Sequence, residues 1–158
     1  MRLHLQHALL ESGVEAGVLL ETEDGWIKTV RVEGRSLSLS GDASVDDDRF
    51  PRPAGETSGL TLPTLANCHS HAFHRALRGR TQRERGSFWT WREQMYAVAA
   101  ELTPDTYFEL ARDTYAEMRA TGIGAVGEFH YLHHQPDGTP YDDPNEMGKA
   151  LLAAADEA

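Results

Sequence analysis

Two short apolar segments with the composition of strands, Leu60–Cys68 and Ile123–Tyr131, are separated by a long stretch with helical character. Within that stretch the apolar residues recur at the spacing of one helical face: Trp91, Met95, Val98 and Leu102. A strand followed by a helix and a second strand favours parallel pairing, because the connection must cross from one end of the sheet to the other. The sequence therefore predicts an α/β fold of parallel strands and crossover helices.

The helix boundaries are also readable from residue types. Thr103 has an N-cap side chain, and Pro104 suits the first helical position, where no backbone N–H is needed. Gly122 suits the left-handed conformation that ends many helices. The basic stretch from Arg75 to Arg85 is expected to be a loop or a short helix and loop, and the chain should become helical again near Glu146.

The first 61 residues have the patterns of strands and turns. Val14–Glu21 and Trp26–Val32 flank an Asp-Gly pair, which predicts a β-hairpin. A polar stretch from Gly41 to Gly59 follows, and its acidic run Asp46–Asp48 is interpreted as a solvated loop rather than a metal site. Two segments are therefore expected, residues 1–61 and residues 62–158.

Charge and cysteine content exclude several classes of function. The formal net charge of −10 disfavours binding to nucleic acid and to anionic membrane surfaces. The chain has one cysteine, Cys68, so it cannot form an internal disulfide, which is typical of a reducing cytoplasm. The first residues lack the apolar core of a signal peptide, and no stretch approaches the ~20 apolar residues of a membrane span. We expect a cytoplasmic protein that acts on small molecules.

His69 and His71 follow the first predicted parallel strand. Side chains two apart on a strand point to the same face, so both imidazoles would approach one point, where a metal ion such as zinc would fit. The alternative is that they are ordinary surface or core histidines, since His-x-His alone is a weak motif. Cys68 would face the opposite side and is interpreted as a small core residue.

The chain resembles the formimidoylglutamate deiminase family of the amidohydrolase superfamily. The resemblance rests on the histidine pair after a Pro-containing strand and on two strings, SFWTWREQMY from Ser87 and GEFHYLHH from Gly127. It implies a metal-dependent hydrolase with a TIM-like β/α barrel. Residues 1–61 would be an N-terminal β-sandwich segment, and residues 62–158 the first strand–helix units. The barrel would be incomplete in this chain, because a whole barrel needs roughly 250 residues.

The same resemblance implies an activity and its residues. His69 and His71 would bind one zinc ion, and His74, Arg92 and Tyr131 would bind the substrate, although His74 departs from the glutamine common in the family. The reaction would convert N-formimidoyl-L-glutamate and water to N-formyl-L-glutamate and ammonia in histidine degradation. The remaining ligands and the catalytic acid and base would lie beyond residue 158, so the segment alone should be inactive. A homodimer is possible for the full-length protein.

Two alternatives remain open. One is another amidohydrolase that removes an amino or chloro group from a heterocyclic ring, and the other is a non-catalytic fragment that retains the fold. His130, His133 and His134 are interpreted as structural or solvent-facing histidines rather than a second metal site. Glu128 and His130 are expected to share a strand face toward the barrel, with no assigned role.

Overall fold

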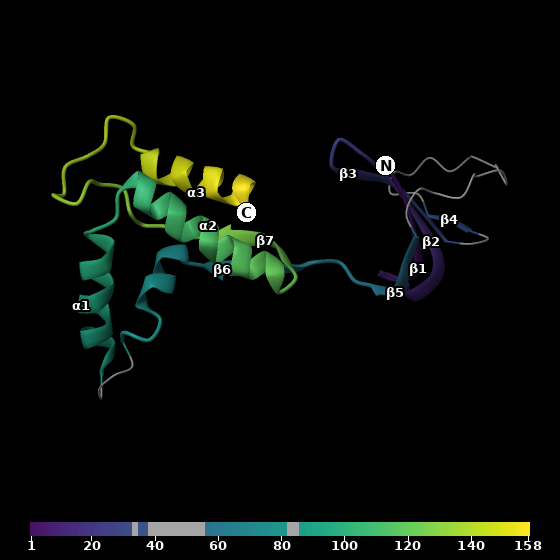
Figure 1. Cartoon of the computed structure of the whole chain (residues 1–158), viewed down its shortest axis with the longest axis horizontal. Coiled ribbons are helices and arrows are strands. Elements are labelled where there is room, and N and C mark those ends of the chain that lie inside the picture. The colour runs from purple at the N-terminus through teal and green to yellow at the C-terminus, as the bar shows by residue number, and fades with distance from the viewer. Residues whose placement is uncertain (33–34, 38–55, 82–85) are drawn as a thin grey trace. The chain divides into compact units, whose positions relative to one another are not determined.

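The computed structural model describes residues 1–32, 35–37, 56–81 and 86–158. The chain forms two compact units, Met1–Pro63 and Thr64–Ala158 (Figure 1). The predicted acidic loop at Asp46–Asp48, as well as Arg83 and Arg85, lies outside the described residues. No helix in the described ranges combines the length and apolar character needed to cross a membrane.

The first unit contains one sheet of five strands in the order β4-β3-β2-β1-β5. The strands are β1 (Arg2–Leu10), β2 (Gly13–Glu23), β3 (Trp26–Val32), β4 (Arg35–Leu37) and β5 (Glu56–Thr61). Neighbours pair antiparallel except β1 and β5, which pair parallel. One face of the sheet buries a small apolar cluster: Leu5, Ala8, Val18, Val30 and Val32.

The predicted hairpin is confirmed in β2 and β3, which pair from Val18 with Val32 to Glu23 with Trp26. Asp24 and Gly25 connect them with φ angles of 52° and 79°. Positive φ at both central positions matches the right-handed twist of the strands, and Asp-Gly tolerates it well. The local turn chemistry therefore determines this hairpin.

The second unit contains two parallel strands, β6 (Leu65–Ser70) and β7 (Ile123–Glu128). The segment between them contains a 3₁₀ helix, η1 (Ala72–Leu77), and two α-helices, α1 (Phe88–Ala99) and α2 (Pro104–Ala120). After β7 a loop leads to α3 (Glu146–Glu157), which packs beside α2 (Figure 1). The predicted parallel pairing and crossover helices are confirmed.

The start and end of α2 follow the predicted residues. Thr103 is the N-cap, and its hydroxyl accepts a hydrogen bond from the Thr106 N–H while the Thr106 hydroxyl accepts one from the Thr103 N–H. This reciprocal capping satisfies two backbone donors that the helix itself leaves unpaired. At the other end Gly122 has a φ of 89°, as the glycine there predicts.

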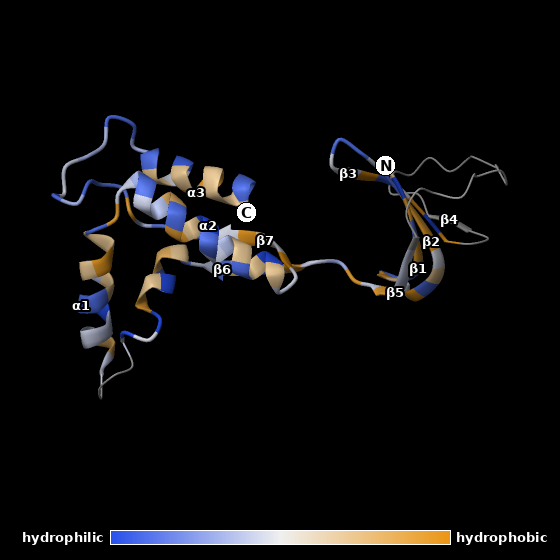
Figure 2. Ribbon diagram, viewed as in Figure 1, coloured by the Kyte–Doolittle hydropathy of each residue, from blue (hydrophilic) through white to orange (hydrophobic). Residues whose placement is uncertain are grey.

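The core of the second unit lies between the helices and the loop after β6. Hydrophilic and hydrophobic residues alternate along α2 and α3 (Figure 2), which gives each helix an apolar side. The fully buried residues are Ala72, Phe73, Tyr107, Ala111, Met147 and Ala154. Phe73 and Ala72 bring η1 into this core, so the segment that follows the histidine pair is packed rather than loose.

Two predicted strands have different limits in the structure. Leu60–Cys68 is divided, because its first residues belong to β5 in the first unit and its last residues to β6 in the second. Pro63, which cannot donate a ladder hydrogen bond, stands in the connection between them. The strand is also not buried as predicted, since Leu65 is 67% exposed. The segment Ile123–Tyr131 is a strand only as far as Glu128.

The absence of a side chain at Gly124 allows β7 to approach the segment before β6. A Cβ atom at this position would lie 2.7 Å from the Cβ of Thr64, closer than real Cβ contacts allow. We expect Gly124→Ala to lower the free energy of unfolding by about 1–3 kcal/mol, the usual cost of overpacking. Urea unfolding would measure it. In a Thr64→Gly background the cost should shrink, and an equal cost in both backgrounds would contradict this explanation.

Candidate metal and substrate site

His69 and His71 converge at the end of β6. Their Nε2 atoms are 3.0 Å apart, and their rings are nearly perpendicular, with centroids 4.8 Å apart. His69 is the fifth residue of β6, and His71 is the N-cap residue of η1. The pair lines a shallow hollow with four other residues: Cys68, Gly127, Phe129 and Tyr131.

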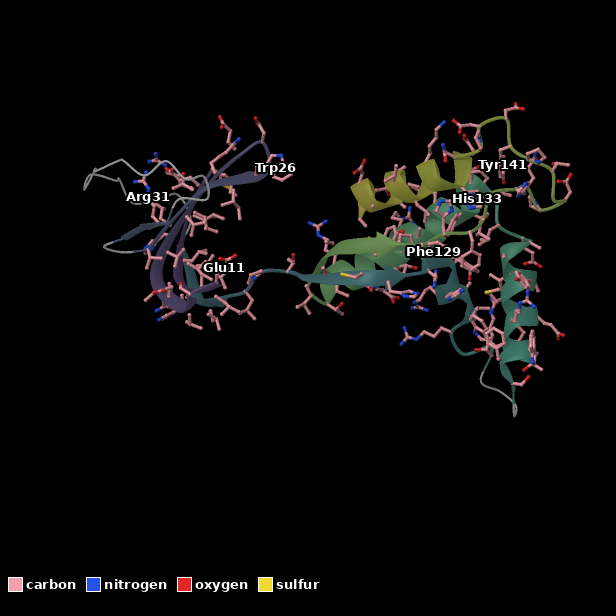
Figure 3. All side chains as sticks on the ribbon, turned by 180° about the vertical axis from the view of Figure 1, so that it is seen from behind. Glu11, Trp26, Arg31, Phe129, His133 and Tyr141 are labelled. Atoms are coloured by element: carbon pink, nitrogen blue, oxygen red, sulfur yellow. The ribbon has the colours of Figure 1, made fainter. Side chains whose placement is uncertain are left out.

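The hydrogen bond of His71 determines which ring nitrogen carries its proton. His71 Nδ1 lies 2.6 Å from the carbonyl oxygen of Phe129, just after β7. Figure 3 labels Phe129, with His133 and Tyr141 on the loop that follows. A carbonyl oxygen only accepts, so Nδ1 must donate, and Nε2 of the neutral ring keeps its lone pair. Metal-binding histidines characteristically donate their second nitrogen to such an acceptor.

The donor set fits one zinc ion in part. Two imidazole nitrogens on a tetrahedral zinc ion lie about 3.3 Å apart, given zinc–nitrogen bonds of about 2.0–2.1 Å. The observed 3.0 Å is close to that separation. Catalytic zinc sites use three protein ligands, and no group of three or more His, Cys, Asp or Glu residues suited to a metal occurs in the described ranges. His69 and His71 could therefore supply two of the three protein ligands that such a site needs.

His74 and Tyr131 lie next to the pair. The Nε2 atom of His74 is 2.8 Å from the hydroxyl of Tyr131, and its ring centroid is 4.7 Å from that of His71. The Tyr131 hydroxyl also contacts Met95 Sδ at 3.1 Å. Burial, and then the neighbouring His71, lower the pKa of His74, and Glu128 opposes them. A neutral His74 can exchange a hydrogen bond with Tyr131 or with a ligand in the hollow.

Arg92 lies on α1, and no described contact joins it to the histidine pair. Its Nη2 atom donates to the hydroxyl of Tyr96 at 3.0 Å, and its Cζ atom lies 4.9 Å from the centroid of the Tyr96 ring. The guanidinium is exposed, and this hydrogen bond uses one of its five N–H donors. Burial, and then the charge of the neighbouring Tyr96, raise the pKa of Tyr131.

The expected direction of the Cys68 side chain is wrong. Cys68 is exposed and lines the same hollow as the histidines, whereas it was expected in the core. The register between β6 and β7 is irregular from Asn67 to Ser70, so strict alternation of faces does not hold there. Glu128 accepts a hydrogen bond from the backbone N–H of Ala72, the first residue of η1.

The three histidines after β7 do not assemble a second site among the described residues. The ring centroids of His130 and His133 are 5.0 Å apart, and burial followed by His133 lowers the pKa of His130. His134 is exposed and forms an isolated bridge with Pro140.

Three residues of the site have no role in the sequence-based prediction. Phe129 contributes its carbonyl group, which every residue type has, so its identity carried no signal. Tyr96 gave no signal beyond its place in the string SFWTWREQMY. Glu128 carried the clearest signal, since an acidic residue inside an apolar strand is costly unless it is paired.

Comparison with known proteins shows close relatives for part of the chain. No protein-family model matches it. Formimidoylglutamate deiminase from Pseudomonas aeruginosa is 40% identical over 139 residues, which cover 85% of this chain and 30% of that protein. The chain thus spans about a third of the length of the relative it matches.

Solved structures agree in fold. An amidohydrolase from Brucella melitensis superposes with a TM-score of 0.78 and 35% identity, over 98% of this chain and 32% of that one. The atrazine chlorohydrolase from Arthrobacter aurescens, complexed with zinc, superposes with a TM-score of 0.68 at 19% identity, over 99% of this chain and 33% of its own. The second likeness supports the fold alone. The predicted fold, shared with part of an amidohydrolase, is confirmed.

Proposed function

This chain is related to formimidoylglutamate deiminase within the amidohydrolase superfamily, and on that premise we propose that the protein hydrolyses N-formimidoyl-L-glutamate. Water replaces the terminal nitrogen of the formimidoyl group, so the products are N-formyl-L-glutamate and ammonia. The convergence of the His69 and His71 Nε2 atoms beside Tyr131 carries the proposal. A hydrolase needs a nucleophile and a substrate pocket in contact, and this hollow offers room for both.

His69 and His71 would hold a zinc ion through their Nε2 atoms. Bound zinc supplies Lewis acidity and makes water nucleophilic near neutral pH. The Phe129 carbonyl keeps the proton of His71 on Nδ1, away from the metal side of the ring. The proton transfers to the leaving nitrogen need an acid and a base that we do not assign within this chain.

The hydrogen-bonded pair of His74 and Tyr131 would position the substrate. Tyr131 lines the hollow, and His74 Nε2 lies 2.8 Å from its hydroxyl, so the pair could meet the polar atoms of the formimidoyl group. Arg92 would bind a carboxylate of the glutamate part, because a planar guanidinium can donate two parallel hydrogen bonds to it. Tyr96 holds that guanidinium from one side and leaves other donors for the ligand.

The substrate assignment is tested by Arg92→Lys in the protein expressed from its complete reading frame. The lysine ammonium is a point charge and cannot donate the two parallel hydrogen bonds of the arginine guanidinium. We therefore expect KM for formimidoylglutamate to rise about tenfold or more, equivalent to about 1.4 kcal/mol. Zinc content should stay the same. Arg80→Lys is the matched control, since Arg80 is also exposed but lies outside α1. Unchanged kinetics in Arg92→Lys would remove this residue from the site.

The alternative activity on heterocyclic rings is an outcome of the same assay. Triazines, pyrimidines and purines lack the two carboxylates of formimidoylglutamate, so their turnover should not depend on Arg92. Turnover of such a ring in preference to formimidoylglutamate would overturn the proposed substrate and leave the fold assignment intact.

A further inference from the structure

Glu128 is the last residue of β7, and its carboxylate points into the protein. Oε1 accepts a hydrogen bond from the backbone N–H of Ala72 at 2.7 Å. Oε2 is buried and has no hydrogen-bond partner in the part of the chain that the structure describes. The Tyr115 hydroxyl supplies a further side-chain hydrogen bond to Glu128. A buried carboxylate with few partners is costly to a fold.

The surroundings of Glu128 come from the buried side of α2. The hydroxyl groups of Tyr107 and Tyr115 lie near enough that, after burial itself, the charge of Glu128 raises the pKa of each. Tyr107 is fully buried, and its hydroxyl also has no partner among the described residues. The carboxylate thus lies between α2 and the first turn of η1.

The hydrogen bond to Ala72 is one of three that join the end of β7 to the segment around His71. The Phe129 N–H donates to the carbonyl of Ser70 at 2.9 Å, and His71 Nδ1 donates to the carbonyl of Phe129 at 2.6 Å. These two hydrogen bonds hold Ser70, the residue before His71, and the imidazole ring of His71 itself. The Glu128 carboxylate is the only one of the three acceptors that is a side chain, and it holds the residue directly after the ring.

We propose that Glu128 is a positioning residue for the metal site. By accepting the first N–H of η1, it sets the direction of the backbone at His71 and so the place where His71 Nε2 meets its ligand. The reach of the side chain matters for this role and its charge does not. The inference rests on the proposed metal site at His69 and His71.

Two conservative variants separate reach from charge in the protein expressed from its complete reading frame. Glu128→Gln keeps an oxygen within reach of Ala72 and loses the charge. Glu128→Asp keeps the charge, but its side chain is one methylene group shorter, so the carboxylate no longer reaches the Ala72 N–H. We expect zinc affinity, measured by chelator competition, to stay within about threefold of wild type in Glu128→Gln and to fall about 10- to 100-fold in Glu128→Asp. In the metal-free protein, amide exchange at Ala72 should quicken in the Asp variant only.

Glu117→Asp is the matched control, because Glu117 also anchors η1, through its ion pair with Arg75, but does not touch residues 70–72. It should leave zinc affinity unchanged. Equal affinities in Glu128→Asp and wild type, or a loss in Glu128→Gln as large as that in Glu128→Asp, would overturn the role of Glu128. If wild type and His71→Ala bind zinc equally, the metal site itself is wrong, which is a distinguishable failure.

Discussion

His71→Ala should lose zinc and hydrolysis together. The variant removes one of the two converging nitrogens, 3.0 Å from its partner, and leaves His69 as a single ligand. Zinc affinity should therefore fall by more than the roughly 10- to 100-fold typical of changes outside the ligand shell. In the protein expressed from its complete reading frame, metal analysis and chelator competition would measure the loss of zinc, and ammonia release from formimidoylglutamate would report the loss of activity.

A matched control is His7→Ala, since His7 is an exposed histidine on β1 in the other unit. Zinc content in this variant should equal that of wild type. Circular dichroism should show both variants folded, because His71 is only half-buried and contributes little to the core. Full zinc occupancy in folded His71→Ala would exclude His71 as a ligand.

Phe73→Ala should cause the largest loss of stability among single changes near the site. Phe73 is fully buried, and its ring lies edge-on to those of His74, Tyr107 and Tyr131. Removing it opens a cavity between η1 and α2, which costs about 3–5 kcal/mol for a buried phenylalanine. Equilibrium unfolding in urea, followed by circular dichroism, would show this as a lower midpoint with an unchanged slope.

Phe88→Ala is the comparison, because Phe88 on α1 is 62% exposed. Its free energy of unfolding should change by no more than about 0.5 kcal/mol, as is usual for surface positions. Similar losses in the two variants would mean that the packing around η1 does not limit the stability of the second unit. Phe73→Leu, which fills more of the cavity, should recover part of the loss.

Local features were predictable because short-range chemistry determines them. The Asp24-Gly25 turn, the Thr103 cap and Gly122 after α2 each depend on neighbours within a few residues, and the structure confirms all three. The parallel pairing of β6 with β7 follows from the helical connection between them. The convergence of His69 and His71 agrees with the prediction, although His71 lies just after β6, where it caps η1.

The rest depends on contacts between segments that are distant in the sequence. The β1–β5 pairing takes the start of the segment Leu60–Cys68 into the first unit, and no local pattern shows that division. The irregular register near Ser70 exposes Cys68, since register is a property of two strands together.

By itself, the sequence determined the strand–helix–strand order of the second unit, the limits of α2, the Asp24-Gly25 turn, and the residue types that suit a metal and a carboxylate. Only the tertiary structure decided how the histidines are held, because the acceptor of His71 is a backbone carbonyl 58 residues away and the acceptor of the Ala72 N–H is a side chain 56 residues away. A backbone carbonyl is the same in every residue, so the residue type at position 129 could not predict its contact with His71. The Glu128 carboxylate gains its partner only when β7 packs against the segment after β6.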